Sequence, residues 1–361
     1  MSQTVPRALR ILLLMGGFIS LACGVAGGLM RLGWSFPLTA AEIAALHGPL
    51  MISGFLGTVI SLERAVAIGR HWAYAGPFFA AAGSFALLGG MHVAGSGLIL
   101  LASLLMLLAS ANIFLRQRAM FTFTLLLGST CWVIGNLLWI NNVAIAQLVP
   151  WWMGFLILTI AGERLELTRM LPPTPYGNRL FAGIVALLLY GAIAATLSAT
   201  AQIAVFSAAL VLLALWLLWN DIARKTVRQH GLTRFIAVCL LSAYVWLLAG
   251  GLIGLLMSPL HPGSSYDAFL HAILAGFVFS MIFGHAPVIF PAVTGFRIPY
   301  HPAFYIPLAV LHLSLVVRIS GDLAALADWR SNGSALNALA LLLFIFNMVT
   351  AVIRGKRPGH P

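Results

Sequence analysis

Charged side chains are scarce in this sequence. Only 8% of its 361 residues are Asp, Glu, Lys or Arg, whereas a soluble domain ordinarily carries about 25%. Hydrophobic residues make up 61% of the chain, and no polar stretch is long enough to form a soluble domain. We therefore predict one all-α polytopic transmembrane domain over residues 1–361. A transmembrane β-barrel is excluded because its strands would alternate apolar and polar residues, while these runs are continuously apolar.

Cysteine is also rare, and acidic residues are fewer than basic ones. The three cysteines have no CxxC spacing, which excludes a disulfide framework or a zinc site of the usual pattern. The chain has 20 basic and 8 acidic residues, giving a net charge of +12. Because the basic residues lie in short loops between apolar runs, the excess indicates membrane topology and not nucleic-acid binding.

Apolar runs long enough to cross a bilayer recur along the whole chain. We predict twelve spans, at residues 9–31, 43–66, 72–95, 97–115, 119–141, 145–165, 179–200, 202–221, 233–257, 268–292, 303–321 and 334–353. Lys and Arg concentrate in alternate loops, so the positive-inside rule places both termini in the cytoplasm. The first span is expected to stay as an uncleaved helix.

Three of these spans share a short pattern. The segments are GFLGTVISLER from Gly54, GFLILTIAGER from Gly154 and GFVFSMIFGHA from Gly276. Each starts with Gly-Phe, and nine residues after the glycine stands a glutamate in the first two and a histidine in the third. The spans that carry the pattern are four apart, which favours three four-helix units over a chance match.

Two histidines within spans are the first candidate ligands. His47 and His271 each lie three or four residues inside spans 43–66 and 268–292. An ionisable group at such a place is a functional-site hypothesis, because its transfer into hydrocarbon is costly. Both spans run from outside to inside, so we expect the two imidazoles at one depth, suited to axial ligation of a haem iron such as haem b. The alternative is that each bonds a neighbouring carbonyl.

Other polar residues in or beside spans form weaker candidates. His285 and His312, with Met281 one turn before His285, could form a second haem or copper site, and packing is the alternative. Arg318 lies near a membrane face, where an arginine can pair with haem propionates.

Glutamate and arginine stand together at the cytoplasmic ends of two repeat-related spans. Glu63 and Arg64 lie at the end of span 43–66, and Glu163, Arg164 and Glu166 lie at the end of span 145–165. One interpretation is an interfacial ion-pair cluster. The other is a proton-entry point or an anchor for a cofactor carboxylate.

Two stretches resemble the NnrS family. HGPLMISGF, from His47, is similar to that family's histidine-plus-Gly-Phe opening, and HAILAGFVFSMIFGH, continuing to VVRISGDL, is similar to its later histidine helix and the helix after it. The resemblance implies a twelve-span, haem- and copper-containing inner-membrane protein of the bacterial nitric-oxide response, with roles for His47, His271 and Arg318. The family's histidine before its Thr-Gly turn is Val293 here, and His285 is a candidate substitute.

A more distant resemblance is to the catalytic subunit of haem-copper oxidases, which has twelve helices and haem ligands on helices two and ten. Spans 145–165 and 179–200 lack the histidines of its copper centre, which argues against an oxidase. The expected function is haem binding between spans two and ten in nitric-oxide or nitrosative-stress metabolism. The expected partners are the lipid bilayer and nitric oxide or a related small molecule. The alternative is a transporter or cofactor-delivery protein without redox chemistry.

Overall fold

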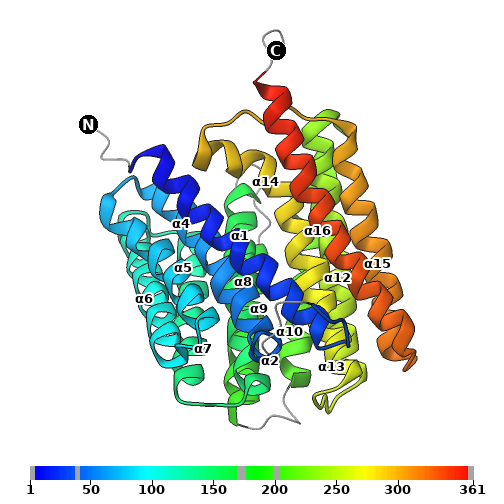
Figure 1. The fold of residues 1–361 in the computed structure, drawn as a ribbon. Coiled ribbons are helices and arrows are strands. Elements are labelled where there is room, and N and C mark those ends of the chain that lie inside the picture. The colour runs from blue at the N-terminus through cyan, green and yellow to red at the C-terminus, as the bar shows by residue number, and fades with distance from the viewer. Residues whose placement is uncertain (1–4, 37–40, 169–175, 198–202, 357–361) are drawn as a thin grey trace. The chain divides into compact units, whose positions relative to one another are not determined.

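The computed structural model describes residues 5–36, 41–168, 176–197 and 203–356, and every regular element in them is a helix. Eleven helical segments in these ranges are long and apolar enough to cross a membrane. They are α1 (Arg7–Met30), α3–η1–α4 (His47–Ile68), α6 (His92–Arg116), α7 (Met120–Ile140), α8 (Ile145–Thr168), α9 (Gly177–Leu197), α10 (Ile203–Asn220), α12 (Gly231–Leu256), α13–η3–α14 (Ser264–Thr294), η4–α15 (Pro302–Leu323) and α16 (Ala327–Gly355). The prediction of an all-α polytopic membrane protein is confirmed (Figure 1).

The remaining predicted span, 72–95, is shorter than expected. It forms the 3-10 turn η2 (His71–Tyr74) and the helix α5 (Ala75–Leu88). The helix ends at a Gly-Gly pair in which Gly90 has φ +77°, a left-handed conformation that glycine adopts without strain. The next helix then begins at His92, so the predicted boundary near residue 96 is wrong.

Contacts divide the chain into two compact units, where the repeat pattern suggested three. Unit 1 comprises residues 1–144 and 289–295, and unit 2 comprises residues 145–288 and 296–361. The first division falls after α7, the fifth predicted span. Each unit is considered below by itself.

Unit 1 is held together by close helix packing and a few buried hydroxyl groups. Its α1 packs against η1 (Leu50–Leu56), α4 (Gly57–Ile68) and α5, while α5 packs on α6 and α6 on α7. A 2.7 Å hydrogen bond between the hydroxyls of Ser110 and Ser129 joins α6 to α7. The indole of Trp132 donates to the hydroxyl of Ser53 at 3.0 Å, which ties α7 to η1. Such bonds satisfy polar groups that lipid could not.

Unit 2 places successive helices against one another. Its α8 packs on α9, α9 on α10 and α10 on α12, and α12 contacts η3 (Ala272–Val278). The last two long helices, α15 (Tyr305–Leu323) and α16, run side by side, as Figure 1 shows. A buried 2.6 Å bond from the amide of Asn337 to the hydroxyl of Ser314 joins them. The short helices α13 (Ser264–His271) and α11 (Ala223–Thr226) pack on α12, and α13 also contacts α15.

Candidate functional site

Two membrane spans each contain a seven-residue π-helical segment. The segments are η1, Leu50–Leu56, and η3, Ala272–Val278. Gly-Phe occupies the fifth and sixth positions of both, so the pattern seen in the sequence coincides with an unusual backbone. The third span with that pattern, α8, is a regular α-helix. Since π-helical turns are rare and occur frequently at functional sites, these two spans are the natural places to look for one.

A histidine stands at the start of each π segment. His271 directly precedes η3, and His47 precedes η1 by three residues. Aligned on Gly-Phe, His47 is seven residues before its glycine and His271 five residues before its own. The two positions are therefore offset by two residues, about 3 Å of helix axis. The repeat relates their spans but does not make the two positions equivalent.

The imidazole of His47 is anchored to a neighbouring helix. Its Nδ1 lies 2.7 Å from the carbonyl oxygen of Gly24 in α1. A carbonyl oxygen can only accept, so Nδ1 donates and the lone pair of the neutral ring is on Nε2. Gly28 permits this approach of α1, because a Cβ there would lie 2.8 Å from the His47 ring.

The imidazole of His271 has the same tautomer and a carboxylate beside it. Its Nδ1 lies 2.9 Å from the carbonyl oxygen of Asp267 and 3.3 Å from the Oδ1 of that residue. A histidine that ligates a metal typically donates its other ring N–H to a carbonyl or carboxylate, which orients the ring and raises the basicity of the ligating nitrogen. The surroundings of His47 and His271 fit that arrangement.

Asp267 is the centre of a partly buried charge cluster formed by α13, α15 and α16. Arg318 donates to its Oδ2 at 2.8 Å, and Arg330 lies 3.7 Å from the same oxygen. The Nε of Arg330 is also 2.8 Å from Oδ1 of Asp322, whose side chain is 0% exposed. The Asp322 contact lacks hydrogen-bond alignment and is an ion pair only. The predicted cofactor-binding arginine, Arg318, thus has a carboxylate partner within its own unit.

The second predicted histidine pair has two different arrangements. His285 donates from Nδ1 to the carbonyl oxygen of Met281 at 3.1 Å, one turn earlier in its helix. His312 instead accepts at Nδ1 from the indole N–H of Trp246, at 2.9 Å. The proton of neutral His312 is therefore on Nε2, which leaves no lone pair for a metal. In the described part of the chain, no three His, Cys, Asp or Glu side chains are placed to hold a metal ion together.

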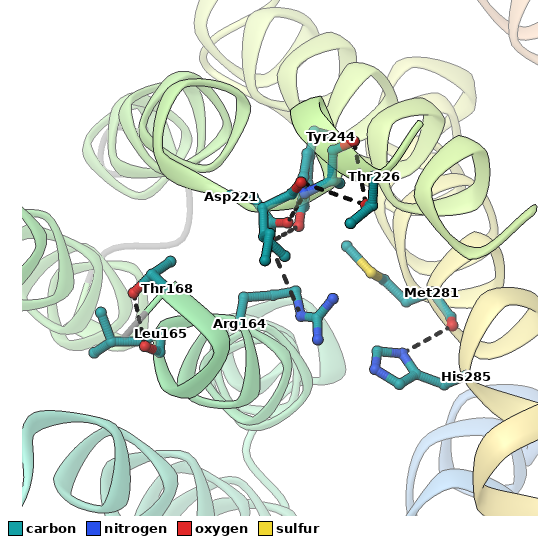
Figure 2. A network of polar contacts seen from close by, with 10 residues as sticks. Arg164, Leu165, Thr168, Asp221, Thr226, Tyr244, Met281 and His285 are labelled. Atoms are coloured by element: carbon teal, nitrogen blue, oxygen red, sulfur yellow. Dashed lines mark hydrogen bonds and ion pairs between the residues drawn. The ribbon is translucent and has the colours of Figure 1, made fainter. Parts of the chain in front are cut away.

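A second buried charge cluster surrounds Arg164, near the end of α8 (Figure 2). Its Nε is 3.9 Å from Oδ2 of Asp221, and both side chains are almost wholly buried. Asp221 accepts shorter hydrogen bonds from other donors, namely the hydroxyl of Tyr244 at 2.7 Å and the backbone N–H of Ala223 at 2.7 Å. Arg164 thus has a carboxylate within its own unit, which the sequence interpretation of a Glu–Arg cluster did not include.

Comparison with known proteins places the chain in a family. A family model described as a domain of unknown function, DUF8744, matches residues 10–353. The chain belongs to the DUF8744 family. No curated protein matches it. The DUF8744 match spans both units and includes every site residue described above.

The residues of this DUF8744 protein that sequence reasoning missed are mostly acidic. Asp267 lies one residue before predicted span 268–292, and Asp221 is the last residue of predicted span 202–221. The chain has only 8 acidic residues. An acid next to an apolar span was therefore a signal for a buried ion pair, although its partner could not be named.

Proposed function

We propose that this membrane protein binds haem through His47 and His271 and acts in nitric-oxide or nitrosative-stress metabolism in a bacterial inner membrane. The observation that carries the proposal is shared by both histidines. Each stands at the start of a π-helical segment with Nδ1 held by a carbonyl oxygen, so Nε2 is the basic nitrogen. A bond from Nδ1 to a carbonyl oxygen is not distinctive by itself, since His285 makes one too. The distinctive feature is that bond together with an adjacent π-helical segment.

The residues present suit a haem iron in their donor chemistry. Neutral imidazole Nε2 is a common axial ligand, and a bound haem would supply an iron that takes up nitric oxide or an electron. Asp267 holds the His271 ring in one orientation and strengthens its basicity. Arg318 fits a propionate less well, because Asp267 already accepts its hydrogen bond. The nitric-oxide part of the proposal rests on the resemblance of two stretches to the NnrS family.

The test is the absorption spectrum of protein purified from a haem-replete host. Bound haem gives a Soret band, and an iron that takes both imidazoles is low-spin with sharp α and β bands after reduction. His47→Ala and His271→Ala should each convert a low-spin spectrum to a five-coordinate one or abolish it. Two irons with one histidine each would instead give high-spin spectra, and each substitution would remove about half of the haem.

The matched controls are exposed histidines outside the spans. His71→Ala and His230→Ala should leave the spectrum unchanged, because both residues are solvent-exposed. A colourless native protein, or a spectrum that survives both His47→Ala and His271→Ala, would refute haem ligation at these residues. Normal haem with no response to nitric oxide would refute only the nitric-oxide part.

A transporter is the second candidate, and buried charge within or directly next to the spans favours it. Charged side chains inside a membrane are costly and often mark a substrate or ion path. Here Arg164, Asp221 and Asp322 are all buried. A haem-free protein that moves a solute in vesicles would support this alternative.

A further inference from the structure

The guanidinium of Arg164 is buried without an adequate hydrogen-bond acceptor. Its side chain is 4% exposed, and its only ion-pair partner among the described residues, Asp221, is 3.9 Å away. No acceptor lies within bonding distance of its Nε. A guanidinium cannot lose its charge in a protein, and it carries five N–H donors. Because buried donors are nearly always satisfied, a further acceptor is required here.

Asp221 balances the charge of Arg164 but does not accept a hydrogen bond from its Nε. Both of its carboxylate oxygens accept 2.7 Å bonds from Tyr244 and from the backbone N–H of Ala223. These two short bonds hold the carboxylate in place on its own side of the guanidinium. Electrostatic attraction therefore remains, while the Nε of Arg164 has no hydrogen-bond acceptor.

The other side of the guanidinium faces Met281 and His285 on α14 (Phe279–Thr294). Figure 2 shows the terminal nitrogens of Arg164 directed to that side, away from Asp221. His285 donates from Nδ1 to the Met281 carbonyl, so its Nε2 carries the lone pair. The terminal N–H groups of Arg164 and the Nε2 of His285, which can accept a proton, therefore border the same place.

We propose that Arg164 and His285 form a buried site for a small planar oxyanion, of the carboxylate type, that binds together with one proton. The planar fork of a guanidinium matches two oxygens of such an anion, and a spherical anion does not use it. Water molecules alone could accept from Arg164. They would not explain why Tyr244 and the Ala223 N–H keep the carboxylate of Asp221 from bonding to Arg164.

The charge count explains the proton. A monovalent anion that bound alone would add an uncompensated negative charge beside Arg164, Asp221 and Glu163, among buried helices. His285 can take a proton from water on Nε2 and cancel the charge that the anion adds. The charged groups that act on His285 are Glu163 and Arg164 from α8 and Asp221 after α10, with the Tyr244 hydroxyl of α12 bonded to Asp221. This inference does not depend on haem.

The experiment uses formate as the probe with the purified full-length protein in detergent at low ionic strength. Equilibrium binding of labelled formate is expected to be saturable, and chloride is expected not to compete at equal concentration. In unbuffered solution near neutral pH, about one proton should be taken up per formate bound. Absence of saturable formate binding in the native protein refutes the site, whatever its variants do.

The variants separate anion binding from folding. Asp221→Asn removes the opposing charge and should tighten formate binding about tenfold or more. Arg164→Gln combined with Asp221→Asn removes both charges without leaving an unpaired one, and should abolish binding. His285→Gln should retain anion binding but take up no proton. Equal formate affinity in the native and doubly substituted proteins, or weaker binding in Asp221→Asn, overturns the proposal.

Discussion

Asp267→Asn is the most direct test of how unit 2 is held together at α13, α15 and α16. The substitution keeps the size of the side chain and leaves the backbone carbonyl that anchors His271. It removes the charge that faces Arg318 at 2.8 Å and Arg330 at 3.7 Å. Two unit charges about 4 Å apart attract by about 4 kcal/mol at an effective dielectric constant of about 20.

The net cost of the substitution is smaller than the sum of those attractions, because Arg318 and Arg330 regain some solvation when the carboxylate is removed. Removing one member of a buried pair typically costs about 3–5 kcal/mol. The Asp267 side chain is 20% exposed, so solvent screening favours the lower limit, about 3 kcal/mol. The measurement is a denaturant titration in detergent followed by tryptophan fluorescence, which the 10 tryptophans of the chain make sensitive.

A double variant distinguishes an ion pair from a general loss of packing. Adding Arg318→Gln to Asp267→Asn removes the arginine charge left without its closest partner, and should recover at least about 1 kcal/mol relative to additivity. Asp328→Asn is the matched control, because Asp328 is an exposed acid in the first turn of α16 and should cost at most about 1 kcal/mol. If Asp267→Asn costs no more than this control, the cluster does not stabilise the unit and the reasoning fails.

Three further predictions follow from packing, tautomer and loop charge. Gly276→Val should destabilise the folded protein by about 3 kcal/mol or more, because even a Cβ would lie 2.5 Å from the Trp246 ring. Its control is Gly97→Ala, where a Cβ would have nothing within 4 Å. That change should stabilise α6 by about 0.5–1 kcal/mol in the same titration. His312→Leu should leave the metal content measured by mass spectrometry unchanged and cost about 1–3 kcal/mol, since it strands the indole N–H that His312 now accepts; a loss of metal would restore His312 as a ligand. Reporter fusions after Lys225 should be cytoplasmic and fusions between α12 and α13 periplasmic, and the reverse pattern would overturn the proposed orientation.

The span positions were predictable because hydrophobic length is a property of consecutive residues. Each predicted span corresponds to a helical segment, and the boundary error at Gly89 and Gly90 came from reading two glycines as part of an apolar run. The π segments were not predictable. A π turn and an α turn share the same apolar composition, so Gly54 and Gly276 mark the places only in hindsight.

Partners of the buried charges were beyond the sequence for a different reason. Arg318 and Asp267 are 51 residues apart, and a sequence identifies charges without identifying the pairs they form. The same holds for histidine tautomers. His285 and His312 look alike in an apolar helix, yet one donates from Nδ1 and the other accepts there. That difference is set by neighbouring backbone and indole groups, and it decides which ring can bind a metal.

Two buried arginines of unit 2 show how contact geometry distinguishes a side chain that stabilises the fold from one that can bind a ligand. Arg318 donates to Asp267 at 2.8 Å, and Arg330 and Asp322 complete a cluster with equal numbers of positive and negative groups. Arg318 makes one short hydrogen bond in this cluster, although its Nε lacks an acceptor, as the Nε of Arg164 does. The charge of Arg164 is also balanced, by Asp221. However, Oδ2 of Asp221 is 3.9 Å from the Nε of Arg164 and accepts a hydrogen bond from Tyr244 instead. A buried donor that the protein orients and does not satisfy is the one that a bound molecule can use.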